Sequence, residues 1–350
     1  MKSKYDILGN HIRLIDTRNR ESITDRVLGI NIDKFFMPSV ANVIGTDLSK
    51  YKLITKGKFA CNPMHVGRDE RLPVALYDEE EPAIVSPAYF MFEVVDNSIL
   101  NEDYLMMWFR RPEFDRICWL HTDGSVRGGI TWDDICRLEL PIPPIEKQLE
   151  IVNSYKAITE RIALKQKIND NLESMLTAVY FEQFYSSKAS EYTKLSDLMV
   201  FGNGKSRPKT NGTIPVYGGN GVLSYTDKYN AENTVLIGRV GAYCGSVYFE
   251  QSICWVSDNA IFAKSKITND EFFNYFLLKG LNLFNHHVGT GQQLLTQDIL
   301  NNIEVQKPDI EQIGLFNMKA KSVFETISAN KCEIIRLQKL SDLLLARLAS

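Results

Sequence analysis

The chain has 350 residues, of which 44% are hydrophobic and 24% are charged, and its formal net charge is −3. This composition is typical of globular protein with room for two or three domains, and it excludes a mainly disordered chain. The net negative charge excludes indiscriminate nucleic-acid binding, so any DNA-binding surface must be local. The chain has no apolar run long enough to span a membrane and no N-terminal secretory signal, so we expect a cytoplasmic protein. Six cysteines without a C-x-x-C pair favour buried, reduced thiols over a zinc site.

Residues 1–145 are predicted to form a first globular unit. Short apolar or β-branched runs predict strands at residues 12–15, 53–54, 59–61, 83–85 and 89–92. The stretch 103–111, rich in Leu, Met and Trp, predicts a core helix, and a loop with three glycines follows at 121–129. Strands mixed with a packed helix indicate a mixed α/β domain.

Residues 146–190 contain a long helix, predicted over 146–185. Its seam residues recur at alternating steps of four and three, which keeps them on one face and is typical of a coiled coil. The seam consists of Ile151, Tyr155, Ile158, Ile162, Lys165, Asn169, Leu172, Leu176 and Val179. Lys165 and Asn169 make the centre of this seam polar.

The second half of the chain repeats the first. Residues 191–308 again contain predicted strands, at 234–237 and 261–262, and an apolar helix at 270–279. A second long helix follows over 309–350, and adding 165 to each seam position gives its seam. That seam consists of Phe316, Ala320, Val323, Ile327, Asn330, Ile334, Leu337, Ser341 and Leu344. The chain is therefore an internal duplication.

Two stretches are basic although the chain is not. Residues 50–71 hold six Lys or Arg against two acidic residues, and residues 194–239 hold six against three. A DNA-facing patch on an acidic body needs such local charge, although an ordinary solvated face is an equal alternative for either stretch. The candidate DNA-binding residues in the first stretch are Lys56, Lys58, Asn62, Arg68 and Arg71. Those in the second stretch are Lys205, Arg207, Lys209, Tyr217, Asn220 and Arg239.

The segment 201–209, FGNGKSRPK, is the sharpest local signal. Glycines with interleaved cations let backbone amides and the side chains of Lys205, Arg207 and Lys209 approach phosphates or base edges closely. A Walker loop is excluded because Met199 occupies its first glycine position, and a dinucleotide fingerprint because Arg207 occupies its third. Further on, Asn220 lies in a glycine loop, where Asn is either a reader of adenine or, more commonly, a turn residue. Arg239 follows a strand and is suited equally to guanine, phosphate or a salt bridge.

The signals for catalysis and for metal binding are weak. Asn62-Pro63-Met64 is only partly similar to the Asn-Pro-Pro-aromatic signature of amino-methyltransferases, since it lacks the second proline and the aromatic residue. His286-His287 has no partner at metal-ligand spacing. Neither a catalytic set nor a metal site is predicted.

Several segments together resemble the specificity subunit of type I restriction-modification systems. They are TWDDICRLELPIPPIEKQ, FMPSVANVIGTDLSKYKLITKGKFACNPM, IPVYGGNGVLSYTD, VLIGRVGAYCGSVYF and the long helix after each globular unit. The resemblance implies two target-recognition domains, 1–145 and 191–308, each reading one half of a bipartite DNA site. It also implies that the helices of 146–190 and 309–350 pair as an antiparallel coiled coil with pseudo-two-fold symmetry.

The resemblance further implies partners. Two methyltransferase subunits would dock on the helices and bind S-adenosylmethionine, and restriction subunits would join and use ATP. The chain itself would be a non-catalytic reader of double-stranded DNA with no cofactor of its own. The alternatives are a coiled-coil adaptor that binds only protein, or a methyltransferase in its own right.

Overall fold

The computed structural model describes residues 5–41, 43–64, 66–122, 128–185, 191–289 and 291–348. The chain divides into two compact units, and each contains a sheet-rich part together with segments of both long helices. Unit 1 comprises residues 1–164 and 333–350, and unit 2 comprises residues 165–332. The long helices begin close to the predicted boundaries, but each unit takes part of each helix into its own fold. Within the described residues, the helices are too short or too polar to cross a membrane.

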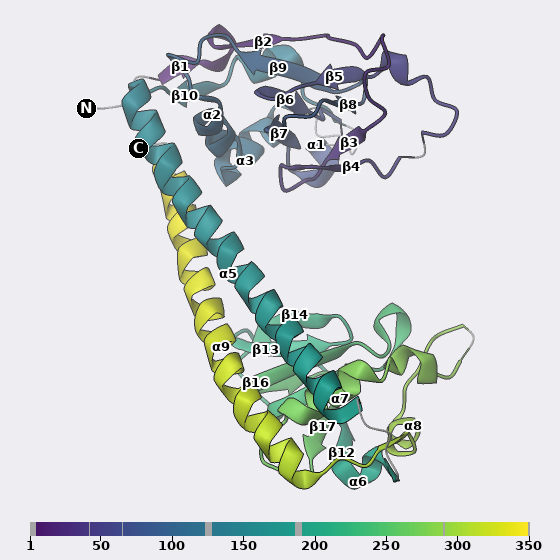
Figure 1. The fold of residues 1–350 in the computed structure, drawn as a ribbon. Helices are drawn as coiled ribbons and strands as arrows, with labels where there is room; N and C mark the ends of the chain where they lie inside the picture. The colour runs from purple at the N-terminus through teal and green to yellow at the C-terminus, as the bar shows by residue number, and fades with distance from the viewer. Residues whose placement is uncertain are drawn as a thin grey trace. The chain divides into compact units, whose positions relative to one another are not determined.

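Unit 1 contains two four-stranded sheets and one two-stranded sheet (Figure 1). The strand orders are β2-β9-β6-β7, β4-β3-β8-β5 and β1-β10. The strands are β1 (Tyr5–Ile7), β2 (Ile12–Leu14), β3 (Val27–Ile30), β4 (Phe36–Pro38), β5 (Lys52–Ile54), β6 (Lys58–Cys61), β7 (Val74–Tyr77), β8 (Ala83–Val85), β9 (Phe90–Val94) and β10 (Glu139–Pro141). The predicted strands of this unit are therefore present.

Short helices complete unit 1, and their first residues explain where they begin. They are α1 (Val66–Asp69), α2 (Glu102–Phe109), α3 (Pro112–Leu120) and α4 (Trp132–Cys136), with 3-10 turns η1 (Leu8–Asn10) and η2 (Leu48–Lys50). The side chain of Asn101 accepts a hydrogen bond from the backbone of Tyr104 at the start of α2. Pro112 occupies the first position of α3, where its missing N–H costs nothing.

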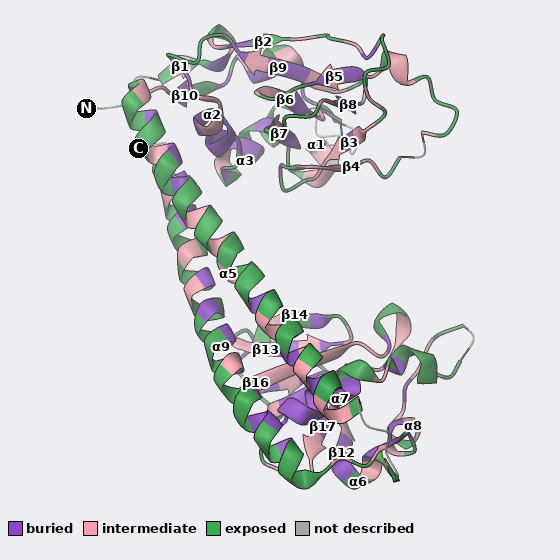
Figure 2. Cartoon of the chain, viewed as in Figure 1, coloured by how far each residue is buried: buried purple, intermediate pink, exposed green. Residues whose placement is uncertain are grey.

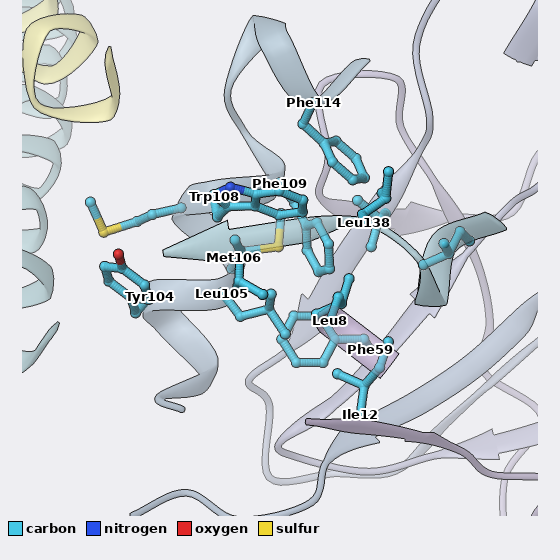
Figure 3. Close-up of a cluster of buried hydrophobic side chains, with 14 of the residues drawn as sticks. Leu8, Ile12, Phe59, Tyr104, Leu105, Met106, Trp108, Phe109, Phe114 and Leu138 are labelled. Carbon is cyan, nitrogen blue, oxygen red and sulfur yellow. The ribbon is translucent and has the colours of Figure 1, made fainter. Parts of the chain in front are cut away.

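Aromatic side chains fill the core of unit 1. The rings of Phe59 and Phe92 stack at 5.0 Å, and Phe109 meets Phe59 edge-on at 5.8 Å. Figure 3 shows Phe109 and Phe114 in the same cluster as Phe59, with Leu8 and Leu138. The helix α2 therefore packs against the sheet through its apolar face, which agrees with the core helix predicted at 103–111.

Unit 2 contains one six-stranded sheet and one two-stranded sheet. The strand orders are β12-β17-β15-β16-β13-β14 and β11-β18. The strands are β11 (Tyr192–Lys194), β12 (Met199–Asn203), β13 (Ile214–Gly218), β14 (Gly221–Thr226), β15 (Ala231–Gly238), β16 (Val247–Val256), β17 (Ala260–Ser265) and β18 (Glu304–Gln306). The helices are α6 (Leu195–Leu198), α7 (Phe272–Gly280) and α8 (Gln297–Asn301), with η3 (Gly241–Tyr243) and η4 (Leu283–His286).

The two sheet systems have the same topology. In strand order, β2, β9, β3 and β4 of unit 1 correspond to β12, β17, β13 and β14 of unit 2. The long β15 takes the place of β5 followed by β6, and the long β16 takes the place of β7 followed by β8. In both units a parallel pairing, β3 with β8 or β13 with β16, joins the same two positions. The duplication predicted from the sequence therefore extends to the globular parts.

A single backbone position shows how the strands diverged. Gly57 separates β5 from β6 with φ +81, and Asn233, at the equivalent position, has φ +43 within a bulge of β15. Both residue types tolerate this left-handed conformation. In unit 1 the chain turns at this point and the strand ends, whereas in unit 2 it only bulges and continues.

The long helices α5 (Ile145–Tyr185) and α9 (Ile310–Arg347) run antiparallel within each unit. In unit 1, Arg161 pairs with Glu333 at 2.5 Å, and Val152 and Leu345 are buried in the same core. In unit 2, Lys165 contacts Asn330, and Gln183 contacts the backbone of Gln312, so residue numbers rise on one helix and fall on the other. Every predicted seam residue is buried or half-buried, while exposed residues cover the outer faces (Figure 2). The predicted fold class is confirmed.

The polar centre of the seam lies in unit 2. Lys165 Nζ donates to Asn330 Oδ1 at 2.9 Å, and Asn330 Nδ2 donates to Asn169 Oδ1 at 2.8 Å. These three side chains, which form the polar centre of the predicted seam, therefore pair across the two helices. A buried polar contact of this kind fixes the register of a coiled coil, because a slipped register would leave it unpaired.

Candidate nucleic-acid interface

Carboxylates neutralise the first basic stretch, in unit 1. Lys56 forms an ion pair with Glu80, and Lys58 forms one with Glu93. Arg71 contacts Asp33 at 2.8 Å. The hydrogen bond from Lys56 to Glu80 also raises the pKa of the lysine. These cations therefore belong to local ion pairs of the free protein.

The other two candidates of unit 1 differ from these. Asn62 Oδ1 accepts from the backbone N–H of Met64 at 3.1 Å, so Asn62 stabilises a turn. The side chain of Arg68 lies outside the described residues. The role of both in DNA binding stays a prediction.

The second basic stretch, in unit 2, presents cations without carboxylate partners. Lys205, Arg207 and Lys209 are all exposed, and none forms an ion pair with a carboxylate of the described chain. The backbone beneath them is nevertheless fixed. Lys205 N donates to Val256 O at 3.0 Å, and Trp255 Nε1 donates to Lys205 O at 3.3 Å. A fixed backbone with exposed cations suits contact with phosphates.

Gly204 makes this close packing possible. A Cβ built on it would lie 1.9 Å from Ser257 O, a distance that no side chain tolerates. The glycine in the FGNGK segment therefore serves the packing of this segment against the end of β16, which the sequence alone did not show.

Asn220 and Tyr217 lie on the β13–β14 hairpin and face different surroundings. Gly219 and Asn220 form the two-residue turn, with Gly221 at φ +76, and Asn220 is exposed at its tip. Tyr217 is half-buried and donates from its hydroxyl to Glu250 Oε2 at 2.9 Å, and burial raises the pKa of the phenol. Asn220 is thus available at the surface, whereas the polar end of Tyr217 is already bound.

A chain of three side chains ends at Arg239. Arg239 Nη1 donates to Asn203 Oδ1 at 3.2 Å. When the side-chain amide of Gln297 is turned so that both its oxygen and its nitrogen have hydrogen-bond partners, its nitrogen donates to Phe201 O at 3.3 Å. In the same orientation it accepts from Asn203 N at 3.0 Å and from Asn203 Nδ2 at 3.1 Å. Gln297 thereby orients Asn203, and Asn203 orients the guanidinium.

Three loops of unit 2 lie close together where strands β12, β13 and β15 end. This place is called the edge of the sheet below. Lys205 forms a bridge with Ser257, and a Cβ on Gly219 would lie 3.8 Å from Gly238 Cα. The fold therefore brings Lys205, Asn220 and Arg239 to the same edge. Sequence reasoning missed Asn203, Ser257 and Gln297. Asn203 had a signal, its place within the glycine-rich segment, but Gln297 lies about ninety residues away and had none.

The same edge of unit 1 carries different chemistry. At the strand positions equivalent to Asn203 and Arg239, unit 1 has Asp16 and Pro63. Asp16 pairs with Arg18 at 2.6 Å, and this hydrogen bond lowers the pKa of the carboxyl group. The two units thus have the same sheet topology, but the side chains at this edge differ.

A cleft of about 700 Å³ opens in unit 1 and is lined by Arg71, Arg110, Arg116, Asp33 and Trp119, among others. A buried ion pair lies beside it, in which Lys34 Nζ donates to Asp115 Oδ1 at 2.6 Å and to Leu72 O at 3.1 Å. Burial lowers the pKa of Lys34. Lys34 belongs to the loop between β3 and β4, so the pair fixes this loop to α3.

Metal-binding and thiol chemistry have little support. The described residues contain no group of three or more His, Cys, Asp or Glu side chains that would hold a metal ion. Cys61, Cys118, Cys244 and Cys254 are buried, and Cys136 is half-buried. The expectation of buried thiols is wrong for Cys332, which is exposed because it points away from the seam of α9.

Comparison with known proteins identifies the class. Residues 188–341 match the family described as type I restriction modification DNA specificity domain. The crystal structure of a type I restriction-modification system S subunit from M. genitalium is similar over 99% of this chain and 95% of that chain, with 15% identity and a TM-score of 0.60. A structure reported for complex assembly and conformational transition of the type I R-M system is similar over 99% of this chain and 97% of that chain, with 16% identity and a TM-score of 0.50. Curated protein sequences gave no match.

Residues 188–341, which hold the sheets of unit 2 and most of α9, are therefore similar to a type I restriction-modification DNA specificity domain. The whole chain has the fold of a specificity subunit of these systems. The resemblance predicted from the sequence is confirmed.

Proposed function

We propose that this chain is the DNA-reading specificity subunit of a type I restriction-modification complex and that each unit reads one half of a bipartite site. The observation that carries the proposal is the edge of unit 2. There, exposed cations that have no carboxylate partner in the described part of the chain lie on a segment similar to a specificity domain, in a chain whose net charge is −3. Local positive charge on an acidic body binds the DNA backbone without binding DNA everywhere.

The duplication supports two half-sites. Both units have the same strand order, whereas the side chains at the equivalent edge differ, as Asn203 and Asp16 illustrate. Two copies that keep the scaffold and vary the edge are suited to reading two different sequences. Base contacts specify a sequence, and phosphate contacts position the protein.

The long helices are the proposed docking surface for two methyltransferase subunits. Several large hydrophobic side chains of these helices are more than a third exposed, among them Leu164, Ile168, Met175, Ile335, Leu340 and Leu343. Exposed apolar residues in such number mark interaction surfaces. In this proposal the methyltransferase subunits bind S-adenosylmethionine, restriction subunits use ATP, and the specificity subunit has no catalytic role.

Exchange of one unit tests the proposal. Residues 193–305 are replaced by the equivalent segment of a relative that directs methylation to a different site, and methylated positions are mapped across the host genome. The expected result is a change in one half-site, with the other half-site unchanged. Exchange of 5–122 is the matched control, because it should change the other half-site.

A change in both half-sites after either exchange would overturn the assignment of one half-site to each unit. Normal methylation at the original site after both exchanges would overturn the DNA-reading function itself.

A further inference from the structure

Arg239 has an unusually constrained position for an arginine outside an ion pair. Its backbone is held on both sides, since Arg239 N donates to Asn259 O at 3.1 Å and Leu295 N donates to Arg239 O at 2.8 Å. Its half-buried side chain contacts Asn203, which Gln297 orients in turn. The guanidinium is therefore directed by three elements, β12, β15 and α8.

The charge of Arg239 is incompletely satisfied. No carboxylate of the described chain pairs with it, and its Nε is buried without a hydrogen-bond partner. Nearby, Ser257 Oγ is also buried without a partner, on a residue that is 1% exposed. Buried donors without acceptors are costly, and each one in a native protein needs an explanation. The surrounding structure holds Arg239 in place in spite of this cost.

The backbone at Gly238, next to Arg239, is packed too closely for a side chain. A Cβ on Gly238 would lie 2.3 Å from Tyr243 O and 2.5 Å from Ser246 Oγ. Glycine at this position lets the loops at the ends of β15 and β13 approach closely. The guanidinium thus lies where several loops meet rather than on a long mobile arm.

We propose that Arg239 is a specificity-determining residue of unit 2 and that it reads a guanine in the half-site bound by this unit. The inference rests on the proposed function. Asn203 accepts one hydrogen of Nη1, so the second hydrogen of Nη1 and the two of Nη2 remain for the O6 and N7 acceptors of guanine, the commonest specific contact of arginine with DNA.

A phosphate contact is the competing role for any DNA-binding arginine. The exposed cations Lys205, Arg207 and Lys209 fit that role better, because phosphate contacts need charge but little orientation. The hydrogen bonds that link Gln297, Asn203 and Arg239 orient the guanidinium, and the reading of a base requires such orientation. In unit 1 the equivalent residue is Pro63, so the half-site of unit 1 should be read by other residues.

Selection of binding sites tests the inference. The tagged full chain, purified from its host with the subunits that accompany it, selects duplexes from a random DNA pool. This is done for wild type, Arg239→Ala, Arg239→Lys and Asn203→Ala. Wild type should select a guanine at a fixed position of one half-site, and Arg239→Ala should lower the discrimination at that position about 10- to 100-fold. Arg239→Lys should also lose discrimination, because lysine cannot donate in a bidentate manner.

Asn203→Ala and one further variant, Lys209→Ala, make the result decisive. Asn203→Ala should weaken discrimination at the same position, because Arg239 loses its orientation. Lys209→Ala is the matched control and should weaken binding to all sequences equally. A uniform loss with Arg239→Ala, together with a flatter salt dependence, would overturn the inference in favour of a phosphate contact.

Unchanged selection by Arg239→Ala would overturn it as well. If wild type itself selected no sequence, the proposed function would fail rather than this assignment alone. Circular dichroism and the melting temperature show whether each variant is folded, and Arg239→Lys is the variant least disturbing to the fold.

Discussion

The two units show which parts of a duplicated fold remain fixed and which diverge. The strand order is the same in both, although unit 1 divides two of its strands where unit 2 keeps them continuous. The edges differ more: carboxylates pair with the cations of unit 1, whereas Lys205, Arg207 and Lys209 have no such partners in the described chain. Packing on all sides constrains which residues the core can hold. A residue at the edge is constrained only by the few groups that it contacts.

The connection between each long helix and its unit gives a second contrast. Gln148 of α5 accepts from Asn101 N at 2.9 Å and donates to Ile99 O at 2.7 Å. Asn317 of α9 accepts from Phe273 N at 2.8 Å. At the repeat offset of 165, Gln148 corresponds to Ile313, and Asn317 corresponds to Val152. In α5 the amide precedes the apolar residue by about one helical turn, and in α9 the order is reversed. Each amide nevertheless caps the helix that packs beside it.

Removal of these amides should give the largest effects. Gln148→Leu removes the partner of three part-buried backbone groups, Asn101 N, Ile99 O and Pro143 O, so we expect a loss of about 3 kcal/mol in the stability of unit 1. Asn317→Leu should destabilise unit 2 by a similar amount. Hydrogen exchange measured residue by residue should show faster exchange in the affected unit alone.

Asn153→Leu is the control for these variants, because Asn153 is an exposed amide on the same helix α5. Faster exchange in both units after either change would show that the units do not unfold separately.

Neutralising the two basic stretches should separate the units by DNA affinity. Replacing Lys205, Arg207 and Lys209 by Gln should weaken binding on the order of 100-fold near physiological salt and flatten the salt dependence by about three counterions. Replacing Lys56, Lys58 and Arg71 by Gln should change affinity only a few-fold, because carboxylates already neutralise these cations. Binding titrations of a specific duplex over a range of salt concentrations measure both. Equal losses would mean that DNA displaces the ion pairs of unit 1.

The smallest expected effect concerns pH. Glu271 precedes α7 at the position where Asn101 precedes α2, and it is 2% exposed. Burial raises the pKa of Glu271 above its ordinary value, although Ser265 N and Asn274 donate to its carboxylate. The folded state therefore holds this proton more tightly than the unfolded state does. The stability that the protonated group contributes is fully present below the unfolded pKa and is lost as pH rises through the folded pKa.

Glu271→Gln should remove this dependence, so the stability gained by the variant should grow as pH rises through that window. Hydrogen exchange in unit 2, corrected for intrinsic rates, measures it, and Glu311→Gln controls for the loss of one exposed charge. A pH dependence identical to that of wild type would show that the carboxylate is not the cause.

The sequence predicted the repeat and the long helices because both depend on local, periodic signals. The seam spacing alone identified the inward faces of α5 and α9, including the polar centre of Lys165, Asn169 and Asn330. Thr131 and Thr296, matched by the repeat offset, both prove to be helix N-caps. Such signals survive divergence because helix geometry fixes the spacing of residues that share a face.

The candidate interface was less predictable. Counting charges gave both basic stretches the same weight, because the sequence does not reveal that Glu80, Glu93 and Asp33 fold against the cations of unit 1. The sequence also made Tyr217 a candidate DNA-binding residue, whereas the fold binds its hydroxyl to Glu250. Spacing along the chain therefore determined the architecture of this protein. Contacts between residues far apart in sequence, such as Gln297 with Asn203, decided which charged groups are paired and which are directed outward, because pairing depends on distances that only the tertiary fold creates.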